Sequence, residues 1–144
     1  MFKRVLLASD GSACADKAAA VAVDLASRYG AVIDVVSVVD PVPFLTVPDG
    51  GGEALAYYLD AAEQAAKQGM AKVEALARPA GVAVTCKVLH EHGAAQALVE
   101  QAQQIGADLI VMGSHGWRGL DKLLLGSVAQ KVLTLSTVPV FVVK

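Results

Sequence analysis

The chain has 144 residues, the size of one ordinary domain, and a formal net charge of −2 at pH 7. Hydrophobic residues make up 55% of it and charged residues 18%, a composition typical of a globular protein that needs no metal or disulfide to hold its core. No apolar run approaches the ~20 residues of a membrane-spanning helix, and lysine and arginine do not cluster, so we expect neither a membrane protein nor a nucleic-acid-binding protein.

The first apolar run predicts a strand rather than a secretion signal. Residues 5–8 are apolar, but Ser9 and Asp10 end the run, whereas the apolar run of a signal peptide has about 7–15 residues. The two cysteines, Cys14 and Cys86, lack a CxxC spacing, which fits ordinary packing in a reducing compartment. We therefore expect a cytoplasmic protein.

Strand-like apolar runs and alanine-rich helical segments alternate along the rest of the chain. Gly30, Pro79 and Gly106 stand where helices are expected to end. Ser12 is a favourable N-cap for the first helix, and Gly69 lies inside the second, where glycine costs about 1 kcal/mol relative to alanine. The predicted strands span residues 5–8, 32–39, 82–89, 109–112 and 138–143. The predicted helices span residues 13–29, 53–78, 94–105 and 127–135.

This alternation predicts an α/β fold: a single domain (residues 1–144) with one five-stranded parallel sheet in the order 3-2-1-4-5 and four helices on both faces. The order is flavodoxin-like, within the broader Rossmann-like class. Pro139 cannot donate to a ladder on one side, so the fifth strand is expected at a sheet edge. Because the chain reverses direction between strands one and four, a crevice is expected at their carboxyl ends, lined by residues 9–12 and 113–125.

The second of these loops has the chemistry of a phosphate site, carried by Gly113, Gly116, Gly126 and Ser127. Glycines allow an anion to approach the backbone closely and let consecutive N–H groups point at it. The start of the last helix adds unpaired N–H groups and about half a positive charge, and Ser127 adds a hydroxyl. Each pair alone is also typical of a tight strand exit or a capped helix start, but together at the crevice they favour an anion site.

The spacing Gly-x-x-Gly, nine residues, Gly-Ser resembles the motif of the ATP-binding branch of the universal stress protein family. The likeness extends over essentially the whole chain, through residues 8–12, 38–40, 106–113 and 138–143. It implies a stress-response regulatory protein that binds ATP or another adenine nucleotide. It also implies a homodimer formed through the last strand, in agreement with an apolar edge that is an association hazard when bare. The regulated protein partner is not identified by the sequence.

The resemblance further assigns individual residues to the nucleotide. Asp10 and its two preceding neighbours are expected beside the adenosine, and Val38 is expected to offer main-chain hydrogen bonds to the adenine edge. Met112 is expected to flank the nucleotide, and Val128 to add a main-chain donor at the start of the last helix. The full set of expected nucleotide-binding residues is Ala8, Ser9, Asp10, Val38, Met112, Gly113, Gly116, Gly126, Ser127 and Val128. Some relatives have proline at the position of Ala8, which alters loop rigidity more than donor placement.

Cations are expected to reach the site through the nucleotide rather than through protein ligands. Mg²⁺ would use phosphate oxygens and keep most of its waters. Arg118 or Lys122 could reach a phosphate, whereas His115 is expected in solvent. His90 and His92 stand two residues apart, but zinc would need further ligands, so we expect no metal site on the protein itself.

Binding rather than catalysis is the expected activity. Hydrolysis of ATP needs an oriented water and charge neutralisation at the γ-phosphate, and although Asp10 or Asp121 could orient a water, no base with a partner is evident. Two alternatives stay open: a weak ATPase or phosphotransferase that uses the same pocket, and a nucleotide-free interaction module that uses the apolar residues 41–48. Residues 40–52 are expected either to pack over the sheet edge or to form a flap over the crevice.

Overall fold

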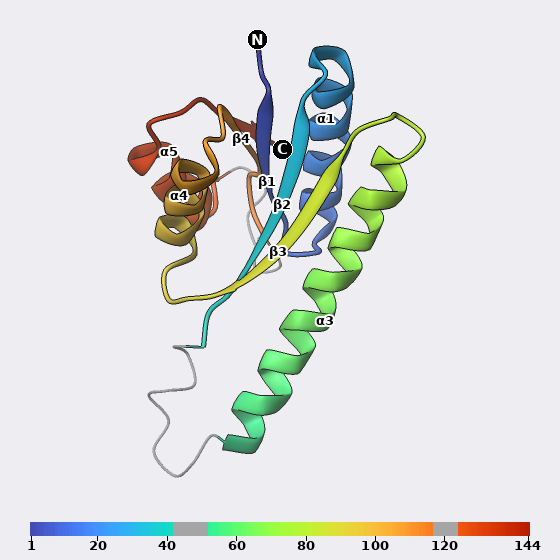
Figure 1. The fold of residues 1–144 in the computed structure, drawn as a ribbon. Coiled ribbons are helices and arrows are strands. Elements are labelled where there is room, and N and C mark those ends of the chain that lie inside the picture. The colour runs from blue at the N-terminus through green and yellow to red at the C-terminus, as the bar shows by residue number, and fades with distance from the viewer. Residues whose placement is uncertain (42–51, 117–123) are drawn as a thin grey trace.

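The computed structural model describes residues 1–41, 52–116 and 124–144, within which strands and helices alternate (Figure 1). The strands are β1 (Arg4–Ala8), β2 (Val32–Val39), β3 (Val84–His90), β4 (Leu109–Gly113) and β5 (Val140–Val143). The helices are α1 (Ala13–Tyr29), α3 (Gly52–Ala77), α4 (Ala94–Ile105) and α5 (Ser127–Leu135). Of the described helices, none combines the length and the hydropathy needed to cross a lipid bilayer.

The described strands form one parallel sheet in the order β3-β2-β1-β4-β5, which confirms the predicted topology. β5 lies at the edge, where the carbonyl of Pro139 accepts the amide of Ile110 at 3.0 Å. Two strands begin two residues later than predicted, because turns hold the residues before them. The amide of Val82 donates to a carbonyl at the end of α3 at 3.1 Å, and the amide of Val138 donates to the hydroxyl of Ser136 at 3.1 Å.

The helices cover the two faces of the sheet in pairs, with α1 and α3 on one face and α4 and α5 on the other (Figure 1). β1 is the central strand, so its residues 5–7 are fully buried and alternate between the two faces. On the α1–α3 face the core includes Val5, Leu7, Ile33, Val35, Val73 and Val111. On the α4–α5 face it includes Leu6, Val36, Leu98, Ile110, Met112 and Val132.

The helix ends use the predicted capping residues, with one exception. The hydroxyl of Ser12 accepts an amide of the first turn of α1 at 3.3 Å. Gly30 and Gly106 end α1 and α4 with φ of 67° and 66°, the left-handed conformation that glycine adopts most readily. The exception is α5, whose N-cap, Gly126, makes no side-chain hydrogen bond. The N-cap of α5 therefore offers only main-chain groups.

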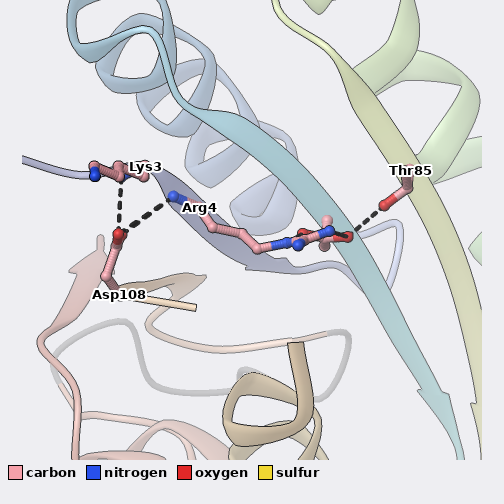
Figure 2. Close-up of polar contacts among 5 residues, drawn as sticks. Lys3, Arg4, Thr85 and Asp108 are labelled. Atoms are coloured by element: carbon pink, nitrogen blue, oxygen red, sulfur yellow. Dashed lines mark hydrogen bonds and ion pairs between the residues drawn. The ribbon is translucent and has the colours of Figure 1, made fainter. Parts of the chain in front are cut away.

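A polar cluster lies at the amino end of the sheet, away from the carboxyl ends of the strands. The Nε of Arg4 donates to Asp34 at 2.7 Å, and the hydroxyl of Thr85 donates to the same carboxylate; Asp108 accepts the amide of Lys3 at 2.8 Å (Figure 2). Burial opposes ionisation of Asp34, but the hydrogen bonds from Arg4 and Thr85 and the charge of Arg4 outweigh it and lower the pKa of Asp34. The cluster joins the first residues of β1 to β2, β3 and the residue before β4.

Candidate functional site

β1 ends earlier than both of its neighbours, which leaves a step at the carboxyl end of the sheet. Its pairing with β2 ends at Ala8 opposite Val36, and its pairing with β4 ends at Leu7 opposite Val111. The amide of Ser9 makes a last bond to the carbonyl of Val36 at 3.0 Å, while β2 and β4 run on beyond these pairs. The step lies where the sequence predicts a crevice.

Main-chain polar groups from β2 and β4 face this step. Successive residues of a paired strand turn their N–H and C=O groups alternately to its two neighbours. The carbonyl of Val36 is bonded on the β1 side, so the groups of Val38 turn to the same side, beyond the last residue of β1. The amide of Ser114 donates to Val143 of β5 at 2.7 Å, so the preceding Gly113 turns its groups toward β1. Val38 and Gly113 thus present donors and acceptors to the step from opposite sides.

The loop after β1 meets the loop after β4 at this step. The Oδ1 of Asp10 accepts the amide of Ser12 at 2.9 Å in an Asx turn, and Gly11 between them has a φ of 79°. The second carboxylate oxygen of Asp10 lies against Gly116, so closely that a Cβ added to Gly116 would collide with it. The fold therefore brings together two loops from opposite ends of the sequence, as predicted.

A contact that the sequence analysis missed comes from α3. Gly69 is buried against the loop after β1, and a Cβ added to it would lie 3.0 Å from Gly11 Cα, 3.0 Å from Ser9 Oγ and 3.3 Å from the Gly11 nitrogen. Such distances are tighter than normal van der Waals contact with backbone atoms. Gly69 is thus a packing position, where α3 touches the loop that carries Asp10, and the sequence analysis noted only its cost in helix propensity.

The glycines at the two ends of the second loop are also closely packed. A Cβ on Gly113 would lie 2.9 Å from the sulfur of Cys14, in the first turn of α1. A Cβ on Gly126 would lie 3.1 Å from the carbonyl oxygen of Ser114 and 3.3 Å from the Cα of His115. The amide of Gly126 donates to that same carbonyl at 2.6 Å. This amide closes the base of the loop, so an anion must rely on other main-chain donors.

Such donors stand at the start of α5. The first helical bond of α5 runs from the amide of Gln130 to the carbonyl of Gly126 at 3.0 Å, so the amides of Ser127 and Val128 precede it. Ser127 is exposed and Val128 is 36% exposed. Because the N-cap has no side chain, the first N–H groups and the positive end of the helix dipole are accessible to an anion.

Three of the predicted site residues have side chains in or beside the core. Met112 is buried on the α4–α5 face, and Ala8 and Val38 are half-buried against the same cluster. Their side chains serve the packing beneath the step. What Val38 turns toward the step is therefore its main chain.

His115 is more enclosed than the sequence analysis expects. It is half-buried, and its Nδ1 lies 3.0 Å from the hydroxyl of Ser114. The predictions for Arg118, Asp121 and Lys122, and for a flap within residues 40–52, lie outside the described residues, apart from the ends of that segment.

The histidines near the end of β3 are paired with different carboxylates. The Nε2 of His90 lies 3.8 Å from Glu63, and the Nδ1 of His92 lies 3.1 Å from Asp40. Across residues 1–41, 52–116 and 124–144, no group of three or more His, Cys, Asp or Glu side chains is placed to hold a metal ion. The arrangement at the step is suited to an anion held by main-chain N–H groups.

Comparison with known proteins identifies the family. The family model "Universal stress protein family" matches residues 1–144. Universal stress protein MJ0531 of Methanocaldococcus jannaschii is 35% identical over 145 residues, which cover 100% of this chain and 83% of its own length. A universal stress protein of Thermus aquaticus is 38% identical over 144 residues, which cover 100% of both chains.

Solved structures share the fold. Universal stress protein UspA from Lactobacillus plantarum has a TM-score of 0.86 at 23% identity, over 99% of this chain and 98% of its own. A universal stress protein from Archaeoglobus fulgidus in complex with dAMP has a TM-score of 0.69 at 23% identity, over 100% and 98% of the two chains. One in complex with cAMP has a TM-score of 0.68 at 24% identity, over 99% and 96%. From the family model and the two relatives it follows that this chain belongs to the universal stress protein family.

Proposed function

We propose that this protein binds ATP, or another adenine nucleotide, at the carboxyl ends of β1 and β4 and acts as a stress-response regulator. The observation that carries the proposal is the step above β1. Main-chain groups of Val38 and Gly113 face it from either side, and the Asp10 carboxylate lies against Gly116 in front of it. This order of groups fits a nucleotide, whose flat base would lie beside the exposed main chain of a strand and whose anionic phosphates would lie beside glycines.

The nucleotide would lie across the step from β2 to α5. Val38 would meet the adenine edge with its main chain, and Ser9 and Asp10 would lie beside the ribose. The phosphates would follow the chain from Gly113 to Gly116 and end near the first amides of α5, where the helix dipole favours negative charge. Mg²⁺ would be held by phosphate oxygens.

The comparisons support a nucleotide rather than an inorganic anion. The family neighbour from Archaeoglobus fulgidus is in complex with dAMP, and another universal stress protein is in complex with cAMP. Both ligands share an adenine, a ribose-type sugar and one phosphate. An adenine nucleotide is therefore the ligand class that we propose here, with ATP as the specific ligand because the glycine spacing resembles the motif of the ATP-binding branch of the family.

We propose binding and signalling rather than turnover. Phosphoryl transfer needs a group that orients the nucleophile as well as charge neutralisation. At the step, the carboxylate of Asp10 has one oxygen engaged by the amide of Ser12 and the other against Gly116. That geometry gives the carboxylate a role in holding the loop in shape.

We also propose that the protein is a homodimer formed through β5. β5 is an edge strand with apolar residues, and Phe141 is 45% exposed on it. Pairing with a second copy would cover this edge. The free thiols of Cys14 and Cys86 fit a reducing compartment, so we expect the protein to act in the cytoplasm.

The test is nucleotide binding by calorimetry in two glycine variants. Gly116→Val places a Cβ on Asp10, and Gly126→Val places one 3.1 Å from the Ser114 carbonyl. We expect each variant to weaken ATP binding at least about 100-fold, a loss of roughly 3 kcal/mol of binding free energy, while the circular dichroism spectrum is retained. The matched control is Gly52→Val, because no atom lies within 4 Å of a Cβ added at Gly52. Unchanged ATP affinity in either loop variant would falsify the site.

A further inference from the structure

Ser114 is the point where four parts of the molecule meet. It follows β4 and is 3% exposed. Its amide donates to the carbonyl of Val143 at 2.7 Å, and its carbonyl accepts the amide of Gly126 at 2.6 Å. Its hydroxyl lies 3.0 Å from the Nδ1 of His115 and 3.8 Å from the sulfur of Cys14. One buried residue therefore contacts the last strand, the start of α5, the loop from Gly113 to Gly126 (the glycine loop) and the first turn of α1.

Cys14 ties the same parts together from the other side. Its thiol donates to the carbonyl of Val143 at 3.3 Å, so this carbonyl at the end of β5 receives both the thiol and the amide of Ser114. The Cys14 sulfur also fills the space beside Gly113, where an added Cβ would lie 2.9 Å away. Cys14 is 5% exposed, so these contacts are shielded from water.

The carbonyl of Val143 is therefore linked to both ends of the glycine loop. Gly113 is held through Cys14, and Gly126 is held through Ser114. Gly113 directly precedes Ser114, and the amide of Gly126 bonds to the carbonyl of Ser114, so an anion held beside either glycine acts on the position of Ser114. Ser114 in turn donates to β5, the strand with an exposed edge.

We propose that Cys14 and Ser114 are positioning residues that couple nucleotide occupancy of the loop to the C-terminal edge strand β5. The inference rests on the proposed nucleotide site and adds that nucleotide binding at this site affects β5. Because coupling is reciprocal, a partner that pairs with β5 raises nucleotide affinity by the same factor by which the nucleotide favours pairing.

The experiment is hydrogen exchange measured by mass spectrometry, with and without saturating ATP. In the wild-type protein, we expect ATP to slow exchange in peptides that cover β5 by at least about fivefold. Ligand binding also stabilises the whole fold by mass action, so peptides from β3, the opposite edge strand, serve as the internal reference. The slowing of exchange by ATP must be greater in the β5 peptides than in the β3 peptides.

Three variants separate coupling from packing. In Cys14→Ala, we expect ATP to bind, with exchange still slowed at residues 113–116, but the excess response of β5 to fall below about twofold. Cys14→Ser keeps a donor for Val143 and is expected to restore the response, which a purely structural role of Cys14 does not predict. Cys86→Ala, the change of the exposed cysteine on β3, is expected to behave as the wild type.

The outcomes are distinct. If calorimetry finds no ATP binding to the wild-type protein, the proposed function fails and the coupling with it. If ATP binds but exchange in β5 is slowed no more than in β3, or if Cys14→Ala keeps the full β5 response, the coupling alone is overturned. Should Cys14→Ala not fold, the comparison of β5 with β3 in the wild-type protein still decides.

Discussion

Replacing Gly69 with alanine adds a single atom, the Cβ, which raises helix propensity but crowds the packing around α3. In an exposed helix the change adds about 1 kcal/mol of stability. Here the new Cβ would lie 3.0 Å from both Gly11 Cα and Ser9 Oγ. Over-packing against backbone typically costs 1–3 kcal/mol, so the expected net change runs from about zero to a loss of about 2 kcal/mol. The loop that carries Asp10 must also move by a few tenths of an ångström.

The assay combines thermal unfolding with ATP calorimetry. We expect Gly69→Ala to lower the melting temperature by up to about 6 °C, at about 3 °C per kcal/mol for a domain of this size, and to weaken ATP binding about tenfold. The control is Gln68→Ala, one residue earlier on the exposed side of α3, where stability is expected to change by less than about 0.5 kcal/mol and affinity not at all. A Gly69→Ala variant that melts higher and binds ATP normally refutes the reasoning, because α3 then does not bear on the loop.

The remaining predictions concern the two edge strands and the polar cluster. Partial burial of the largely exposed thiol, its hydrogen bond to Glu74 and the charge of Glu74 raise the pKa of Cys86 to about 11. Alkylation of this thiol at pH 8 should therefore be about 100-fold slower than in the unfolded chain, and Glu74→Gln should speed it; equal rates would contradict this. The pKa of Asp34 is lowered in the folded protein, so its ionised form stabilises the fold at pH values above about 3.9, its pKa in the unfolded chain. The urea midpoint of Asp34→Asn should therefore fall below that of the wild type at pH 7, and the difference should close as the pH drops toward 3. A difference independent of pH would argue against the ion pair with Arg4. Phe141→Lys should shift sedimentation equilibrium toward the monomer with little change in melting temperature, and no shift would remove β5 as the dimer edge.

The fold could be predicted because its signals are local. β-Branched runs, the Ser12 N-cap and the glycines at helix ends act through neighbouring residues, and the alternation of strand and helix then limits the topology to few choices. The errors are local as well. Val82 and Val138 are apolar and are therefore predicted as strand residues, but their amides make turn hydrogen bonds, so both lie in turns before β3 and β5 begin.

The candidate site was predictable only in part, because its decisive contacts are distant in sequence. The glycine spacing and the strand order predict which two loops meet, and the Asp10 contact with Gly116 agrees. No local sequence pattern indicates that Gly69 packs closely against Gly11, or that the amide of Gly126 donates to the carbonyl of Ser114. Such contacts depend on the distance between two packed elements, and this distance is determined by the volumes of side chains throughout the core.

The shortness of β1 has a consequence for how selectivity can change in this protein. Where a base is recognised by peptide groups at a strand end, exchanging the side chain at position 38 for another β-branched one leaves the hydrogen-bonding pattern intact. Discrimination between bases is then a property of strand length. Lengthening β1 by a residue or two would cover those peptide groups and remove the basis of the proposed selectivity for a base, even with each side chain around the proposed phosphate site retained.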